Sequence, residues 1–135
     1  MTALRTGTVT CLLLLAAAAF PVAHHSFAVY DHTRTLTLKG TVTKFQWTNP
    51  HAFLEVDVPD GSGTKHWSLE LTSINMMQRA GWRSNMIKYG DHVVAVMAPL
   101  LDGQPGGLLL EVTLPSGKKM EPGVPLANTF KRTPE

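Results

Sequence analysis

The feature that most constrains the fold is a two-residue alternation of apolar and polar side chains, which recurs in five short runs along the chain. Loops rich in glycine and proline separate several of these runs. The runs occupy residues 35–47, 52–58, 66–71, 92–98 and 108–114. Because successive side chains of a β-strand point to opposite faces, this pattern is typical of strands that bury one face. The chain is therefore expected to be mainly β.

The first run changes phase along its length. Leu36, Leu38 and Val42 share one parity, whereas Phe45 and Trp47 take the other. A phase change inside one strand requires a bulge or a sharp bend, since a shift by one residue moves every later side chain to the opposite face. A glycine within the run gives the backbone a place to coil. The pattern predicts one long, bent strand.

A short helix is predicted between the third and fourth runs. The residues that indicate it are the N-cap candidate Ser73, then Ile74, Met77 and Ala80 at helical spacing, and Gly81 after the helix end. The order of three strands, a helix and two strands predicts a small five-stranded OB-like barrel with one short helix between strands 3 and 4. An open sheet or a sandwich built from the same elements is the alternative.

The N-terminal segment is typical of a secretory signal peptide. A single cation, Arg5, precedes the apolar stretch Cys11–Phe20, and small residues follow. This stretch is too short for a membrane-spanning helix, which needs about 20 residues. Residues 1–23 are therefore predicted to be a signal peptide, with cleavage after Ala23 or, as the alternative, after Ala19. The mature protein is expected to be exported.

Length and proline content set the remaining boundaries. The 135 residues support a single domain, which is expected over residues 24–114 as an OB-like β-barrel. Residues 115–135 contain four prolines and no periodic apolar pattern. This last segment is therefore predicted to be an extended or disordered tail.

Charge and cysteine content exclude several classes of function. The 12 Lys and Arg residues against 10 Asp and Glu residues give a net charge of +2, which argues against a nucleic-acid-binding protein. The single cysteine, Cys11, lies within the predicted signal peptide. A mature domain without a thiol cannot be an enzyme that uses a thiolate.

Three histidines form the candidate metal site. His24 and His25 stand at the predicted mature start, and His51 directly follows the turn at residues 48–50. Imidazole is the commonest protein ligand for metals such as copper and zinc. A mature N-terminal histidine offers both its α-amine and its ring, and a second histidine completes a three-nitrogen geometry suited to copper, a histidine brace. The alternatives are an exposed start without partners and an imidazole that bonds the turn backbone.

Other polar residues have simpler explanations. His32, His66 and His92 are expected to be ordinary surface or strand positions. The carboxylates of Glu55 and Asp57 fit a solvated strand face better than acid–base catalysis. We assign no catalytic residue, and a binding protein is favoured over an enzyme.

A second candidate site is a face of aromatic side chains. Trp47, Phe53 and Trp67 are the candidate stacking residues for a small ligand or a partner protein, and Glu70 is counted with them. Burial is the simpler explanation for Trp67, because it has the core parity of its strand. This non-metal binding module is the alternative to the metal site.

The segments Ala23-His24-His25-Ser26-Phe27 and 38–51, the latter ending in Trp47-Thr48-Asn49-Pro50-His51, carry a resemblance to a known family. Over residues 23–117 the sequence resembles a family of small exported bacterial proteins catalogued as a domain of unknown function. The resemblance implies a periplasmic OB-like barrel without a known activity. We therefore expect a periplasmic binding protein that holds copper for delivery or buffering, without turnover. The expected partners are a metal ion or a small ligand, with another periplasmic protein as a further candidate. No nucleic acid, and no membrane span in the mature chain, are expected.

Overall fold

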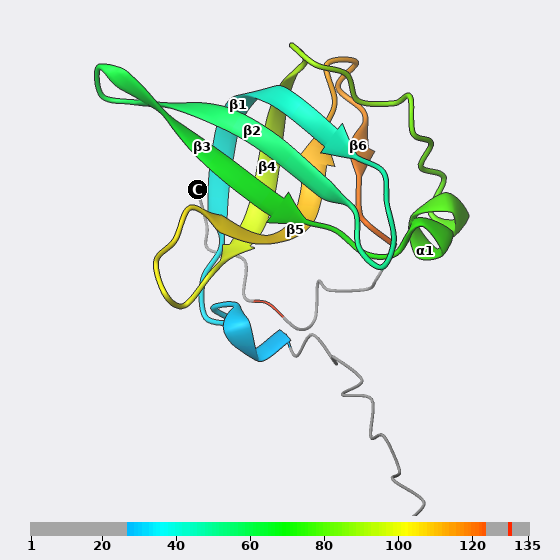
Figure 1. Cartoon of the computed structure of the whole chain (residues 1–135), viewed down its shortest axis with the longest axis horizontal. Helices are drawn as coiled ribbons and strands as arrows, with labels where there is room; N and C mark the ends of the chain where they lie inside the picture. Colours follow the sequence, from blue (N-terminus) through cyan, green and yellow to red (C-terminus); the bar gives the residue numbers. More distant parts are fainter. Residues whose placement is uncertain (1–26, 124–129, 131–135) are drawn as a thin grey trace, which may run out of the picture.

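The computed structural model describes residues 27–123 and residue 130. Its elements, in chain order, are η1 (Phe27–Val29), β1 (Leu36–Gln46), β2 (Phe53–Asp60), β3 (Gly63–Glu70), α1 (Ile74–Arg79), β4 (His92–Pro99), β5 (Gly106–Thr113) and β6 (Lys119–Met120) (Figure 1). All five predicted strands are present, and the helix lies between β3 and β4 as predicted.

The first five strands form a closed barrel (Figure 1). The strand order is β3-β2-β1-β4-β5-β6, and an additional pairing joins β3 to β5. This closing contact is parallel and short, because only Ser68–Glu70 pair with Gly106–Leu108. On the other side of β5, a Cβ atom at Gly107 would lie 2.2 Å from the carbonyl oxygen of Ala98, so the pairing with β4 requires glycine there. The predicted five-stranded OB-like barrel is confirmed.

The first strand bends as its phase change predicts. The first half of β1 pairs with β4, and its second half pairs with β2. The register of the β1–β2 pairing shifts between Val42 and Lys44, which is the predicted irregularity. At Gly40 the strands approach closely, since a Cβ atom would lie 2.7 Å from the carbonyl oxygen of Asp57. The single strand β1 can therefore pair with both β2 and β4 in the barrel.

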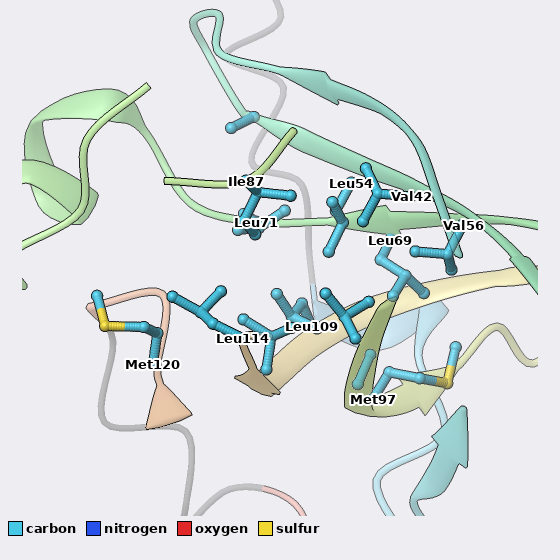
Figure 2. Close-up of a cluster of buried hydrophobic side chains, with 14 of the residues drawn as sticks. Val42, Leu54, Val56, Leu69, Leu71, Ile87, Met97, Leu109, Leu114 and Met120 are labelled. Carbon is cyan, nitrogen blue, oxygen red and sulfur yellow. The ribbon is translucent and has the colours of Figure 1, made fainter. Parts of the chain in front are cut away.

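The barrel interior holds the main hydrophobic core. Figure 2 shows its side chains directed toward one another between the strands. The strands supply Val42, Leu54, Leu69, Met97 and Leu109, which have no exposed surface. Burial of each such aliphatic side chain contributes about 1.5–3 kcal/mol to folding. Met77 of α1 and the following Trp82 and Ile87 belong to the same core.

The domain extends beyond the predicted boundary at residue 114. β6 pairs with the end of β5, and the fully buried Trp82 donates a hydrogen bond from Nε1 to the carbonyl oxygen of Glu121 at 2.7 Å. Pro122 is also fully buried. Phe130 is 3% exposed and joins a second apolar cluster with Tyr30, Ala98, Leu108 and Leu110.

The boundary at residue 114 is corrected accordingly: residues 115–123 and Phe130 are part of the folded domain. The physical reason is that isolated apolar residues, such as Met120 and Phe130, fill gaps in a core without forming any periodic pattern. The predicted signal peptide, residues 1–23, lies outside the described residues, as do residues 124–129 and 131–135.

Candidate functional site

The turn that carries His51 is fixed to the barrel on both sides. On the N-terminal side of His51, the Asn49 side-chain oxygen accepts a hydrogen bond from the backbone N–H of Ile74 at 3.2 Å. After it, the backbone N–H of Ala52 donates to the Thr72 carbonyl oxygen at 3.1 Å, and the Ala52 carbonyl oxygen accepts from Leu71 at 2.8 Å. The turn also contains the cis Asn49–Pro50 peptide bond. His51 is therefore held beside the C-terminal end of β3.

Asn49 supplies the helix cap that the sequence suggested for Ser73. Ser73 stands at the N-cap position with an extended backbone, but its side chain makes no capping hydrogen bond. The Asn49 amide oxygen reaches the first helical N–H instead. The residue that satisfies this N–H group comes from another part of the chain, so local sequence patterns do not reveal it.

The imidazole of His51 and the hydroxyl of Tyr30 share one carboxylate. His51 Nδ1 contacts Glu70 Oε1, and the Tyr30 hydroxyl donates to Glu70 Oε2. The Glu70 side chain is 16% exposed and that of His51 is 29% exposed. Glu70 thus has one oxygen for each of two partners that are 19 and 40 residues away in sequence.

This arrangement determines which nitrogen of His51 carries the proton. A carboxylate only accepts hydrogen bonds, so the contact with Glu70 requires the proton on Nδ1. In the neutral imidazole Nε2 is then the nitrogen with a lone pair, which is the form that binds a metal ion.

Tyr30 is anchored through its main chain as well as its hydroxyl. It forms an antiparallel bridge with Leu100. The neighbouring Asp31 N–H donates to the Pro99 carbonyl oxygen at 2.8 Å, and the Val29 carbonyl oxygen accepts from Leu101 at 3.0 Å. Burial, together with the hydrogen bond to Glu70 and its negative charge, raises the pKa of Tyr30 well above its ordinary value. Tyr30 therefore stays a hydrogen-bond donor throughout the neutral pH range.

Of the three predicted metal ligands, only His51 lies in the part of the chain that the structure describes. His24 and His25 lie outside it. Within residues 27–123 and Phe130, no group of three or more His, Cys, Asp and Glu side chains is arranged to hold a metal ion.

The structure does not bring the predicted aromatic face together. Trp67 is paired with the buried Val56 and packs against the barrel core, whereas Phe53 has the opposite parity on β2. Trp47 packs edge-on against Phe45, with 5.6 Å between ring centroids. Glu70, which was grouped with these aromatic residues, is the cross-strand partner of Phe53, and its carboxylate belongs to the network of His51 and Tyr30.

A second polar cluster on the β2–β3 hairpin was not predicted. His66 Nδ1 lies 2.7 Å from the Asp57 carboxylate, and His66 Nε2 lies 3.1 Å from that of Glu55. Gln46 and Ser68 donate to the other oxygen of Glu55 at 2.9 and 3.0 Å. The hydrogen bond to Asp57 is the main cause that raises the pKa of His66. The cross-strand register, which pairs Asp57 with His66, is the signal that sequence reasoning missed.

Among solved structures, the chain is similar to the crystal structure of the mitochondrial single-stranded DNA binding protein Rim1 from S. cerevisiae. The identity is 8% and the TM-score is 0.45, and the match covers 63% of this chain and 94% of that one. No curated protein matches the chain. No helix in the described part of the chain is long and apolar enough to cross a membrane.

The prediction that excluded nucleic acid as a partner needs correction. That prediction used the net charge of +2, whereas the similar solved structure is that of a protein that binds single-stranded DNA. Single-strand binding on a small barrel depends on a local groove and stacking residues, which the charge of a whole chain does not report. The exclusion of nucleic acid as a partner is therefore withdrawn.

The family comparison agrees with the resemblance seen in the sequence. The matched region, residues 11–111, includes the histidine pair, His51, Glu70 and all five barrel strands except the last residues of β5. The chain belongs to DUF6152, a family of unknown function.

Proposed function

We propose that this chain is an exported, periplasmic metal-binding protein that holds copper through His51, His24 and His25. Its role in this proposal is delivery or buffering of the ion, without turnover. The observation that carries the proposal is the contact between His51 Nδ1 and Glu70 Oε1.

The environment of His51 supports the proposal. Such histidines almost always donate their second ring N–H to a carboxylate or a carbonyl oxygen, which fixes the tautomer and the ring orientation. Glu70 takes this part for His51, because its carboxylate contacts Nδ1. In this proposal Nε2 is the atom that binds the metal ion. Imidazole nitrogens favour copper and zinc over the hard cations.

The position of Tyr30 makes the two N-terminal histidines suitable partners for His51. His25 and His24 precede Tyr30 by five and six residues. Tyr30 itself touches the carboxylate that holds His51. Six residues of fully extended chain span at most about 20 Å, so the segment before Tyr30 is long enough for the histidine pair to reach this site. Cleavage after Ala23 adds the α-amine of His24 to the available nitrogen ligands.

The test is a competition titration of the protein purified after export, with copper and a chelator of known affinity. His51→Ala and His24→Ala are each expected to weaken copper binding by more than about 100-fold, because each removes a ligand. His92→Ala is the matched control, since His92 is an exposed histidine whose ring contacts only Thr41 among the hydrogen bonds described, at 3.2 Å. Copper binding that is absent from the wild type, or unchanged in His51→Ala, overturns the proposal.

A further inference from the structure

We propose that Tyr30 is a positioning residue of this site: its hydroxyl fixes Glu70, and Glu70 in turn holds His51 in the Nδ1–H tautomer before any metal binds. The role of Tyr30 in metal binding rests on the proposed function. The arrangement of the three side chains does not, because it consists of contacts between groups of the chain itself.

The direction of the Tyr30 hydroxyl is determined by its surroundings. Tyr30 is 5% exposed and packs with Ala98, Leu108, Leu110 and Phe130. Its backbone bridges to Leu100. A ring held by both packing and main-chain pairing has one available orientation, and in that orientation its hydroxyl meets Glu70.

The two oxygens of Glu70 are divided between the two partners. Oε1 meets His51 and Oε2 meets Tyr30. A carboxylate held at both oxygens cannot rotate about its terminal bond without losing a hydrogen bond. Without the Tyr30 hydroxyl, one oxygen of this mostly buried group has no replacement within the network described, and the carboxylate is free to turn.

The tautomer of His51 is therefore the property that Tyr30 controls. A neutral imidazole exchanges between its Nδ1–H and Nε2–H forms unless a fixed acceptor selects one. Glu70 selects the Nδ1–H form only while its carboxylate points at Nδ1. The structure thus assigns to Tyr30 the preparation of Nε2 as a ligand atom.

The experiment is a long-range ¹H–¹⁵N correlation spectrum of the histidine rings in the metal-free full-length protein, recorded where imidazole is uncharged. The wild type is expected to show His51 in a single Nδ1–H form. Tyr30→Phe keeps the ring but removes the hydroxyl, and we expect a mixture of tautomers. Tyr89→Phe is the matched control, because Tyr89 is 84% exposed, and it should leave the His51 signals unchanged.

A second measurement needs no variant and covers the case in which Tyr30→Phe fails to fold. In the wild type, the Tyr30 hydroxyl proton should exchange slowly with water and show a nuclear Overhauser effect to the Nδ1 proton of His51. An unchanged single tautomer in folded Tyr30→Phe, a wild-type His51 in the Nε2–H form, or a rapidly exchanging Tyr30 hydroxyl overturns the inference.

Copper titration separates this inference from the proposed function. Tyr30→Phe is expected to weaken copper binding about tenfold, which is typical of residues that orient a metal ligand. A wild type that binds no copper, yet shows the predicted tautomer and its loss in Tyr30→Phe, overturns the proposed function alone. A wild type that binds copper, with an unchanged tautomer in Tyr30→Phe, overturns the role of Tyr30 alone.

Discussion

The side-chain oxygen of Asn49 accepts a hydrogen bond from the backbone N–H of Ile74, with 3.2 Å between the two atoms. Ile74 is the first residue of α1. The turn that carries His51 therefore also caps the helix that follows β3. This single contact couples the candidate site to the packing of α1 on the barrel.

Replacement of Asn49 should destabilise the protein more than replacement of Ser73. Asn49→Ala removes the capping acceptor and is expected to lower the free energy of unfolding by about 1 kcal/mol. Ser73→Ala should change it by less than about 0.5 kcal/mol, because the Ser73 side chain makes no capping hydrogen bond. Urea unfolding of the two variants checks this, and a larger loss in Ser73→Ala would contradict the assignment of the cap.

The pairing of β5 with β4 should be sensitive to a single methyl group. A Cβ atom at Gly107 would lie 2.2 Å from the Ala98 carbonyl oxygen and 2.3 Å from Met97 Cε. Gly107→Ala is therefore expected to cost about 3 kcal/mol or more, at the upper end of overpacking effects. Gly63→Ala is the control, since its added Cβ would meet only the Asp60 carbonyl oxygen at 3.8 Å. Equal stability of the two variants in thermal unfolding would argue against this close approach of β5 to β4.

Phe130 should contribute to stability although it lies beyond the predicted domain boundary. It is 3% exposed and stacks on His32 with 4.4 Å between ring centroids. Phe130→Ala is expected to lower the free energy of unfolding by about 3–5 kcal/mol, as for other buried phenylalanines. Leu101→Ala serves as the control, because Leu101 is 64% exposed. A Phe130→Ala protein as stable as the control would restore the boundary at residue 114.

The hairpin cluster around His66 should make stability depend on pH. The pKa of His66 is raised above its ordinary value of 6.5, chiefly by the hydrogen bond to Asp57. The charged imidazole therefore stabilises the fold fully below about pH 6.5, and this contribution is lost as the pH rises through the raised value.

His66→Asn measures this contribution. Its destabilisation relative to the wild type is expected to be largest near pH 6 and to shrink toward pH 8. It should stay below about 1 kcal/mol, because the His66 side chain is 56% exposed. His92→Asn is the control without a carboxylate partner in the described contacts. A difference that stays constant with pH would show that the charge on His66 does not stabilise the hairpin.

Much of the fold could be predicted from the alternation of apolar and polar residues along each strand. The phase change between Val42 and Phe45 predicted a bend, and the register shift between Val42 and Lys44 confirms it. Parity within one strand also indicated that Trp67 faces the core. It did not relate Trp67 to Phe53, because that comparison needs the cross-strand register, in which Trp67 pairs with Val56.

The candidate site was only partly predictable, for the same physical reason. The position of His51 after a turn was visible in the sequence, but its partners were not. Glu70 contacts His51 although the two residues are 19 positions apart in the sequence, and Tyr30 contacts Glu70 from 40 positions away. No local pattern encodes such contacts, which form only once β3 closes against β5 and the segment at Tyr30 bridges to Leu100.

The most direct test of the proposed copper site is a native intact-mass spectrum of the protein after export from its own cells. We expect a chain that begins at His24 and carries one copper ion. A chain that begins at Phe20, or one that begins at His24 and stays metal-free after incubation with copper and zinc, would contradict the proposed site.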